Sequence, residues 1–206
     1  MMDSSCLMLS TSLWTGIDFS AVFKDEDLID TGIERDSHIT VFYSPDKIVP
    51  REGLLSNIET LLGEEEYKKL TKELKDNEPM RILDFFELGK FENDKDYLVL
   101  KLQPENFLYD SLKILNTGLT SAYEIKSTFN EYVPHMTLAM LQPGKAKNYM
   151  FSSTLGLILE TATFSIDDFV LSYGEEKKYQ ITTYNAVTRY FRQKEQERDR
   201  EYYENM

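Results

Sequence analysis

Two short segments of alternating pattern constrain the fold of this chain more than any other feature. They are DSHITVFYSP, residues 36–45, and YVPHMTLAML, residues 132–141. Side chains alternate between the two faces of a β-strand, so residues two positions apart share a face. In each segment a histidine and a threonine share one face, and apolar residues occupy the other. The pattern predicts two strands that each bury one face and present an imidazole and a hydroxyl on the opposite face.

The chain has two histidines, His38 and His135, and each is followed two positions later by a threonine, Thr40 or Thr137. Threonine occupies 16 of the 206 positions, so the chance probability of this coincidence is about 0.006; the repeat is a motif that its structural setting must confirm. The alternative interpretation is that these are ordinary strand residues. A zinc site is a further alternative, but it requires carboxylate ligands at positions that no motif marks.

Two imidazoles facing one space can perform acid–base chemistry. The ordinary pKa of imidazole is about 6.5, so near neutral pH one ring can be neutral while the other is protonated. One ring can then act as general base and the other as general acid on opposite sides of a phosphorus atom, while the hydroxyls donate to its non-bridging oxygens. No metal is required if the substrate supplies a ribose 2′-OH, or if water attacks a 2′,3′-cyclic phosphate.

The charge balance points to a small ligand. The chain has 36 acidic and 23 basic residues and a net charge of −13. Long nucleic acids bind basic surfaces through counterion release, so an acidic chain is a poor candidate for binding them. A small phosphorylated ligand agrees better with this balance. Lys145 and Lys147 are interpreted as solvated surface residues, with steering of an anionic ligand as the alternative.

Cys6 is the single cysteine, so the chain has no internal disulfide and no cysteine-rich zinc site. This usage is typical of a reducing, cytoplasmic compartment, and we interpret Cys6 as a small buried residue instead of a nucleophile. No apolar run approaches the roughly 18 residues of a membrane span, and the N-terminal residues are expected to form a strand instead of a signal peptide. A chain of 206 residues is expected to form one domain with two lobes.

Strand and helix patterns follow one another in two similar passes along the chain. The expected strands are residues 6–14, 38–43, 81–91, 96–103, 135–141, 162–173 and 178–184. The expected helices are residues 25–30, 51–76, 104–116 and 145–160, with Gly63 separating two helices and Gly118 near a helix end. Residues 186–206 carry dense charges of both signs and are expected to form an exposed helix or tail.

The segments DSHITVFY and PHMTLAM resemble the two signature strands of the two-histidine (2H) phosphoesterase superfamily, and their histidines are 97 positions apart (135 − 38). The resemblance implies an α+β, bilobal LigT-like fold with two pseudo-symmetric antiparallel sheets, outer helices and a central cleft. It implies one domain of residues 1–185 with a helical insertion at about 51–76. Within the superfamily, GIERDSHITVFY is most similar to the phage anti-CBASS cyclic-nucleotide phosphodiesterases.

The resemblance implies a metal-independent phosphodiesterase, a phosphoric diester hydrolase without a cofactor. His38 and His135 would be acid and base, in an order that the sequence leaves open, and Thr40 and Thr137 would hold the phosphate. The substrate would be a cyclic di- or trinucleotide immune signal cleaved at a 3′–5′ bond, or another short oligonucleotide. The setting would be the cytoplasm, that of a host if the source is viral, without a membrane or an obligate protein partner.

Two alternatives to this activity stay open. One is an RNA 2′,3′-cyclic phosphodiesterase or 2′,5′-oligonucleotide phosphodiesterase of the same fold. The other is a binding protein that sequesters a nucleotide without cleaving it. Cleavage that depends on the two histidines would separate an enzyme from a sequestering protein.

By analogy with base stacking in nucleotide pockets, aromatic side chains near the cleft should sandwich a base. The candidates are Trp14, Phe42, Phe86 and Tyr184, with core packing as the alternative for each. Phe42 is favoured because strand alternation puts it on the face of His38 and Thr40.

Overall fold

One continuous antiparallel sheet organises the chain. The computed structural model describes residues 4–16, 19–76, 78–126, 131–174 and 177–181. Within these ranges nine strands pair in the order β4-β8-β1-β3-β7-β6-β5, with β9 added to β8 and β2 added to β7. Every pairing is antiparallel. The centre of the sheet is the junction between β3 and β7, the two strands that begin with the His-x-Thr motifs.

The bounds of the elements follow the chain from end to end. The strands are β1 Ser5–Trp14, β2 Leu28–Ile33, β3 His38–Ser44, β4 Met80–Arg81, β5 Phe86–Glu92, β6 Asp96–Leu102, β7 His135–Leu141, β8 Thr163–Tyr173 and β9 Lys177–Gln180. The α-helices are α1 Leu54–Asp76, α2 Phe107–Ala122, α3 Ala146–Met150 and α4 Ser153–Thr161. Three short 3-10 helices are η1 Phe19–Ala21, η2 Asp25–Asp27 and η3 Ile82–Asp84.

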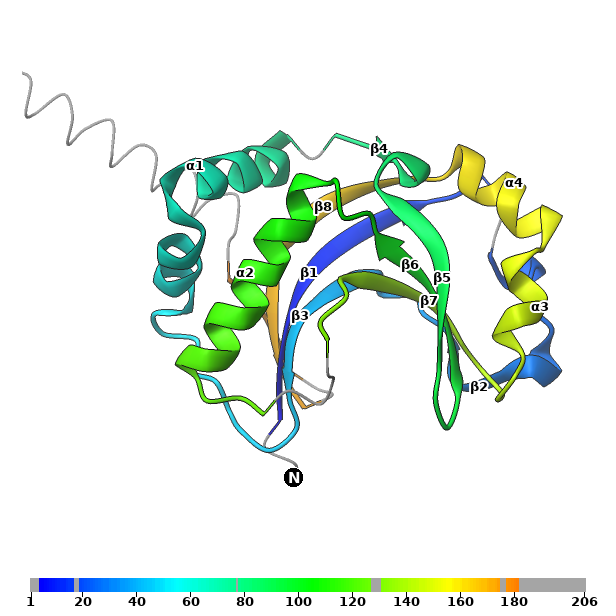
Figure 1. The fold of residues 1–206 in the computed structure, drawn as a ribbon, viewed down its shortest axis with the longest axis horizontal. Helices are drawn as coiled ribbons and strands as arrows, with labels where there is room; N and C mark the ends of the chain where they lie inside the picture. Colours follow the sequence, from blue (N-terminus) through cyan, green and yellow to red (C-terminus); the bar gives the residue numbers. More distant parts are fainter. Residues whose placement is uncertain (1–3, 17–18, 77, 127–130, 175–176, 182–206) are drawn as a thin grey trace, which may run out of the picture.

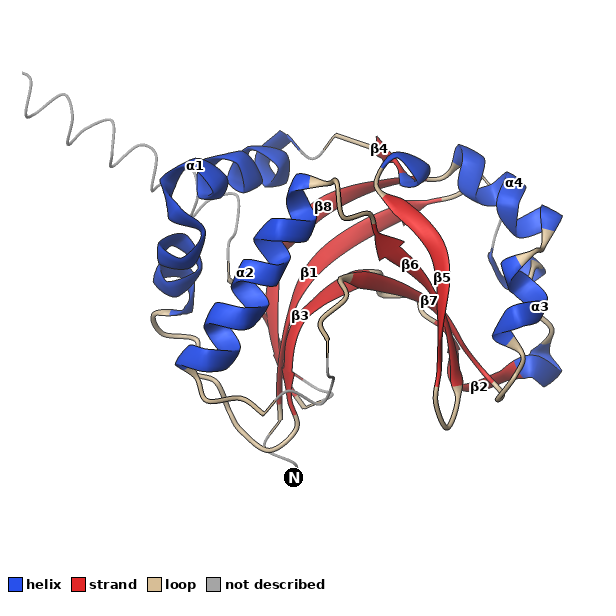
Figure 2. Cartoon of the chain, viewed as in Figure 1, coloured by secondary structure: helices blue, strands red, loops and turns tan. Residues whose placement is uncertain are grey.

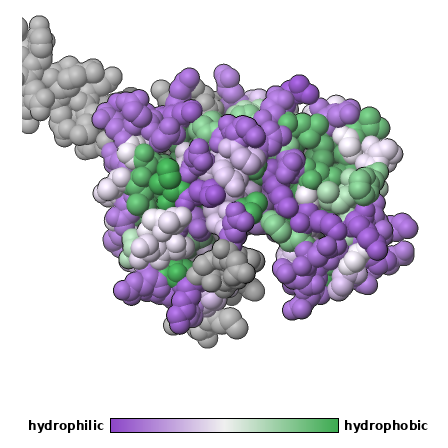
Figure 3. All heavy atoms as spheres, viewed as in Figure 1, coloured by the Kyte–Doolittle hydropathy of each residue, from purple (hydrophilic) through white to green (hydrophobic). Residues whose placement is uncertain are grey.

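The sheet curls into an arch, and the helices lie on its outer side (Figures 1 and 2). Helices α1 and α2 pack on the half that contains β8 and β3, whereas α3 packs on β5 and β6. Apolar strand residues are buried on the helix side of the sheet, among them Leu9, Ile39, Leu100 and Met136. The residues that alternate with them face the inner side, and the space-filling view shows the molecule hollowed between its two halves (Figure 3).

The structure corrects the prediction of two separate sheets. The motif strands β3 and β7 pair with each other through Ile39 and Met136, so the two halves of the chain share one sheet. One half continues outward from β3 to β1 and β8, and the other continues from β7 to β6 and β5. The mixed α and β content and the outer helices agree with the prediction, but the arch replaces a pair of facing sheets.

Gly63 interrupts α1, as the sequence predicts. Its backbone has φ 73° and ψ 170°, a conformation in the positive-φ region that glycine adopts readily because it lacks a Cβ. Figure 1 shows that the two parts of α1 run in different directions. The helical pattern at 51–76 therefore forms two helical pieces that wrap around the edge of the sheet.

Gly118 has a different role from the predicted one. It lies inside α2, which continues to Ala122, and a Cβ built on Gly118 would lie 2.4 Å from Cδ2 of Leu61. The glycine therefore allows α1 and α2 to approach closely. The N-terminus of α2 is fixed by Asn106, whose side chain accepts a hydrogen bond from the N–H of Leu108.

Other segments depart from the predicted elements at their ends. Residues 25–30 form the turn of η2 and the start of β2 instead of a helix, and residues 81–91 are divided among β4, η3 and β5. The predicted helix at 145–160 is two helices, with the side chain of Ser152 capping the second. Residues 182–184 and the tail at 186–206 lie outside the described residues.

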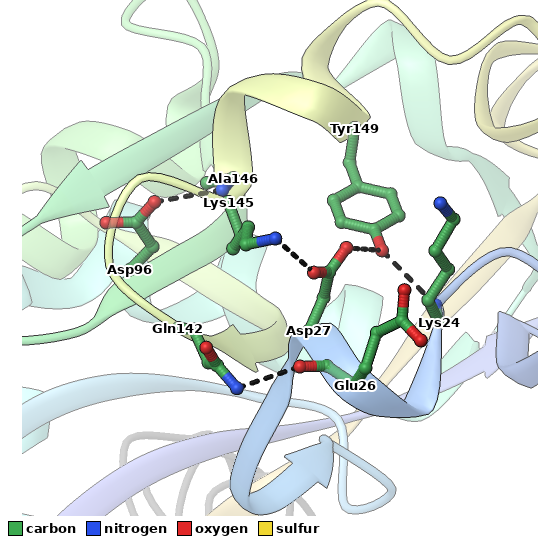
Figure 4. Close-up of polar contacts among 8 residues, drawn as sticks. All are labelled: Lys24, Glu26, Asp27, Asp96, Gln142, Lys145, Ala146 and Tyr149. Carbon is green, nitrogen blue, oxygen red and sulfur yellow. Dashed lines mark hydrogen bonds and ion pairs between the residues drawn. The ribbon is translucent and has the colours of Figure 1, made fainter.

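A buried carboxylate, that of Asp27, links η2 to α3, the helix that follows β7 (Figure 4). Asp27 is 4% exposed; its Oδ1 lies 2.8 Å from Nζ of Lys145, and its Oδ2 accepts a hydrogen bond of 2.8 Å from the Tyr149 hydroxyl. That hydroxyl also accepts the backbone N–H of Lys24 at 3.2 Å. Lys145, whose side chain is 40% exposed, is therefore held in an ion pair with a buried carboxylate, which argues against its alternative interpretation as a residue that steers a ligand.

The same region contains a second buried carboxylate, Asp96, which is 1% exposed. It accepts the backbone N–H of Ala146 at 2.9 Å at the start of α3. The side chain of Gln142 donates to the carbonyl of Glu26 at 2.8 Å (Figure 4). These contacts fix the turn between β7 and α3 against η2 and β6, and so hold the outer end of β7 in place.

No helix in the described ranges is long and apolar enough to span a membrane.

We expect Asp27→Asn to destabilise the protein near neutral pH. The hydrogen bonds from Lys145 and then Tyr149 hold the pKa of the Asp27 carboxyl below its ordinary value. Ionised Asp27 therefore stabilises the fold at pH values above about 3.9, and this contribution is lost as pH falls through the lower pKa of the folded state. Urea unfolding at pH 7 should show a lower midpoint for the variant, and the difference should shrink toward pH 3.

A matched control for this variant is Asp84→Asn. Asp84 is exposed, and its ion pair with Arg81 is 3.9 Å long, so the unfolding midpoint should move little at either pH. Equal midpoints for the wild type and Asp27→Asn at pH 7 would contradict the role given to the buried carboxylate.

Candidate active site

The strands β3 and β7 have the same local structure. In each, partly exposed and buried side chains alternate until the fourth and fifth residues, which are both buried. The cause is a β-bulge: Val41 has no partner in the register with β1, and Leu138 has none in the register with β6. Each bulged residue lies three positions after its histidine. The two halves of the sheet therefore repeat one another around the two motifs.

The pairing of Ile39 with Met136 lies at the centre of this repeat, because each is the residue that follows its histidine. Both side chains are buried on the helix side of the sheet. In the antiparallel register about this pair, the histidine of each strand is the counterpart of the other strand's threonine. The four His and Thr side chains of the motifs are thereby brought together on neighbouring strands, on the face opposite the buried pair.

Both histidines are oriented by the same kind of backbone hydrogen bond. Nδ1 of His38 lies 2.6 Å from the carbonyl oxygen of Asp36, and Nδ1 of His135 lies 2.7 Å from that of Val133. A carbonyl oxygen can only accept, so Nδ1 donates, and in a neutral ring Nε2 carries the lone pair. Each ring is thereby fixed in one tautomer, with Nε2 as the atom that can take or give a proton.

Donors from outside the paired strands satisfy the carbonyls of the two bulges. The side chain of Asn116, on α2, donates to the carbonyl of Val41 at 2.7 Å. The backbone N–H of Glu34 donates to the carbonyl of Leu138 at 3.0 Å. A bulge leaves a strand carbonyl without its regular partner, and an unpaired buried carbonyl is costly. These contacts therefore maintain the bulges, and with them the orientation of the motif residues.

Two side chains contact Thr40. The Tyr132 hydroxyl donates to the Thr40 carbonyl at 2.8 Å and links the loop before His135 to β3. Burial raises the pKa of this hydroxyl far above its ordinary value, so it remains a donor. On the other side, Cys6 hydrogen-bonds the Thr40 side chain, and burial raises the pKa of its thiol to about 11. A thiol with this pKa is protonated near neutral pH, which disfavours Cys6 as a nucleophile.

His38 lies on the wall of a cleft of about 900 Å³. The cleft is bordered by the second half of β1 and by the segment that precedes β3. Its lining residues include Ser10, Trp14, Arg35, Ser37, His38 and Lys178. Polar groups and the aromatic rings of Trp14 and Phe19 thus meet beside the first motif, in a space wide enough for a nucleoside-sized ligand.

The surroundings of His135 are more enclosed. Its register partner on β6 is Lys101, and the ring of Phe91 on β5 contacts it edge-on, with ring centroids 4.8 Å apart and an interplanar angle of 70°. Nζ of Lys101 lies 4.7 Å from the centroid of the same Phe91 ring. The second motif is therefore flanked by an aromatic ring and a cation, where the first is flanked by an open cleft.

This enclosure changes the proton affinity of His135. Burial lowers its pKa below the ordinary value, and the positive charges of His38 and Lys101 act in the same direction, while the hydrogen bond to the Val133 carbonyl opposes them. Desolvation disfavours the charged imidazolium, so the ring is neutral near pH 7. Its Nε2 lone pair is then available to accept a proton.

The structure describes three of the four aromatic residues that the sequence offers for base stacking. Trp14 is 46% exposed and lines the cleft beside His38. Phe42 is 2% exposed and Phe86 is 1% exposed, and both belong to the hydrophobic core. The expectation that Phe42 shares the face of His38 is wrong because the bulge at Val41 shifts the alternation by one residue.

A ring contact accounts for the core position of Phe86, whereas the role of Tyr184 stays a prediction. Phe86 packs in the core against Phe164, with ring centroids 5.1 Å apart and an interplanar angle of 79°, so it is not available to a ligand. Tyr184 lies outside the described residues.

Sequence reasoning missed Phe91, Lys101 and Gly89. Lys101 carries a visible signal, because it is the charged residue between Leu100 and Leu102 in an otherwise apolar strand. Its position opposite His135 depends on the register between β6 and β7, which the sequence does not specify. No group of three or more His, Cys, Asp or Glu residues close enough to hold a metal ion occurs within the described part of the chain.

Comparisons with known proteins do not assign the chain to a family. No protein-family model matches it, and no curated protein matches it. Among solved structures, two of Usb1 from Kluyveromyces marxianus, one with uridine monophosphate, share 12% identity and a TM-score of 0.43 with this chain. The alignments cover 87% of this chain and 98% of Usb1. A likeness of this degree establishes neither fold nor function, so neither is transferred from Usb1.

We expect His135 to titrate below the ordinary imidazole value of about 6.5 in the free protein. NMR of the imidazole protons measures this directly, because the chain has two histidines and His38→Ala assigns them. Phe91→Ala should raise the His135 midpoint toward the ordinary value by exposing the ring to water. Asn93→Ala, a substitution in the exposed turn after β5, should leave it unchanged. A midpoint above 6.5 in the wild type would contradict the desolvated environment.

Proposed function

We propose that the protein is a metal-independent phosphodiesterase of the 2H type that cleaves 3′–5′ bonds in small nucleotides, with cyclic di- and trinucleotide signals as its substrates. The observation that carries the proposal is the pair of His-x-Thr strands joined at Ile39 and Met136. The register about this pair, with two imidazoles of fixed tautomer and two hydroxyls on the face opposite the buried pair, supports the proposal. This is the equipment that phosphoryl transfer without a metal requires.

The different surroundings of the two histidines divide their roles. His135 is desolvated and neutral near pH 7, so it is the general base, whereas His38, on the wall of the cleft, is the general acid. Nε2 of His135 takes the proton of the ribose 2′-OH, and the 2′ oxygen forms a bond to phosphorus. The bond from phosphorus to the 5′ oxygen breaks, and Nε2 of His38 gives that oxygen its proton.

The products of this step are a 2′,3′-cyclic phosphate and a free 5′-OH, and no water is consumed. Thr40 and Thr137 donate hydrogen bonds to the non-bridging oxygens, on which negative charge builds in the transition state. A second step, in which water opens the cyclic phosphate, uses the same two rings with their roles exchanged.

The preference for small nucleotides rests on charge and on space. The net charge of −13 disfavours long polyanions, while the cleft of about 900 Å³ beside His38 has room for a nucleoside and contains the exposed ring of Trp14. Stacking on such a ring accepts any base. Cyclic di- and trinucleotides fit these conditions, as does the end of a short oligonucleotide.

The test is incubation of the purified protein, in EDTA, with cyclic di- and trinucleotides of 3′,3′ and 2′,3′ linkage, 2′,5′-oligoadenylate and an RNA ending in a 2′,3′-cyclic phosphate. Mass spectrometry identifies the products. We expect linearised cyclic nucleotides, and His38→Ala or His135→Ala should each lower kcat/KM by about 10²- to 10⁴-fold. The control Asn93→Ala lies in the exposed turn after β5 and should retain full activity.

Each other outcome of this panel revises the proposal. Cleavage of the RNA end alone would move the protein to RNA processing. A nucleotide that binds and is recovered intact would identify a sequestering protein and would refute the acid–base roles. Activity abolished by EDTA and restored by zinc or manganese would refute the metal-independent mechanism.

The assignment of His135 as base predicts a pH profile. The rate constant kcat/KM should rise with pH through the pKa of His135, so the acidic limb should have its midpoint below about 6.5. Phe91→Ala should move that limb to higher pH. A limb that stays in place in this variant would show that another group is the base.

A further inference from the structure

The repeat of the two halves identifies the position that corresponds to Lys101. In the register with the motif strands, Ser10 on β1 pairs with His38, and Lys101 on β6 pairs with His135. The two positions are equivalent, yet one holds a small hydroxyl that lines the open cleft and the other holds a lysine. The second half of the site therefore has a positively charged side chain at the position where the first half has open space.

The absence of a side chain at Gly89 leaves room for the Lys101 side chain. Gly89, on β5, occupies the position equivalent to Val170 on β8, because they pair with Val99 and Met8 respectively. A Cβ at Gly89 would lie 2.7 Å from Cε and 2.8 Å from Cδ of Lys101. The aliphatic part of the Lys101 side chain thus passes over Gly89 on β5, where there is no side chain. Its Nζ lies 4.7 Å from the centroid of the Phe91 ring.

The ammonium of Lys101 has no carboxylate partner within the described part of the chain. Some other lysines there form ion pairs, as Lys68 does with Glu64, Lys90 with Glu92 and Lys145 with Asp27. Lys69 and Lys113 also lie over aromatic rings, but Lys101 differs from them because it is the register partner of a motif histidine. Glu87 is the register partner of Lys101 on β5 but forms no ion pair with it, and its side chain is exposed. In a chain of net charge −13, a partly buried cation beside the motif residues is left available for an anion.

We propose that Lys101 and Phe91 form a second anion-binding subsite that takes a phosphate group next to the scissile one, so that the enzyme selects nucleotides with at least two phosphates. The proposal rests on the phosphodiesterase function proposed above and specifies its substrate class. A compact ammonium is a strong partner for a phosphate oxygen, and the partly enclosed setting strengthens that attraction.

The order of the strands supports a neighbouring phosphate instead of the scissile one. With the scissile phosphate over the joint of β3 and β7, the cleft lies outward on the β1 side, and Lys101 and Phe91 lie outward on β6 and β5. A nucleoside enters the cleft on one side. The chain of the substrate continues on the other side, where the next charged group meets the ammonium.

The test compares ligands that differ by one phosphate: the dinucleotide ApA, and ApA with an added 5′ or 3′ terminal phosphate. Calorimetric titration at pH 8 uses the His38→Ala background, in which turnover is suppressed. At this pH His135 is neutral in every variant, so Lys101→Met changes one charge only. We expect at least one phosphorylated form to bind roughly 10-fold more tightly than ApA, and Lys101→Met to abolish this preference.

Three further variants make the result specific. Lys101→Arg should retain the preference because it retains the charge, and Gly89→Ala should weaken it by displacing the lysine stem. Lys90→Met removes the same charge one residue from Gly89 and should leave the preference unchanged. Equal binding of the two classes by the His38→Ala protein with Lys101 intact, or a preference that survives Lys101→Met, would overturn the proposal.

Binding separates this proposal from the proposed function. A Lys101-dependent preference in a protein that cleaves no member of the substrate panel would support the subsite and refute the phosphodiesterase. Cleavage of the panel without any such preference would support the phosphodiesterase and refute the subsite.

Discussion

Ile39 and Met136 bury their side chains under the helices and pair their backbones across the centre of the sheet. The rest of the site depends on this contact. Because each residue follows a histidine, their pairing fixes the register of both motifs and turns all four polar side chains to the inner face. A shift of one residue would send the histidines into the core. The bulges at Val41 and Leu138, with their external donors, reinforce the register from both sides.

The two halves share a backbone plan and differ in what surrounds it. The carbonyl-bound imidazole, the bulge and the central pair occur on both sides of the joint. One imidazole is beside an open cleft, and the other is enclosed by Phe91 and Lys101. The proposed acid–base mechanism needs two groups of different protonation state, and different surroundings decide which of the two rings is the neutral one. In the proposed mechanism, the repeated backbone supplies the geometry, and the neighbours of His135, which lower its pKa, favour its neutral form.

Alternation of side chains in the sequence was sufficient to predict β3, β7 and the common face of each His-x-Thr pair. It failed at Phe42, because a bulge is determined by pairing with β1 and by the donor Asn116, both distant in sequence. It also failed at Gly118, whose role follows from the approach of Leu61 on another helix. The alternation could not predict the roles of Lys101 and Phe91 for the same reason. The local pattern specifies which face of a strand a residue occupies, but the register between strands specifies which residues are neighbours across the sheet.

In an acidic protein, the attraction of an anionic ligand depends on the basic side chains that lie close to the binding site. Charges separated by more than about 8 Å in physiological salt are largely screened. A small nucleotide bound as proposed would therefore interact mainly with the charges that border the site, which are the cations Arg35 and Lys101 and the carboxylates Glu34 and Asp36, the last of them paired with Lys178. The flanking phosphates of a long polymer would extend over the acidic exterior and be repelled. The net charge therefore agrees with the proposed preference for small nucleotides over polymers. Lys101 has no carboxylate partner among the described residues, and in our proposal it allows the enzyme to distinguish nucleotides by their number of phosphates.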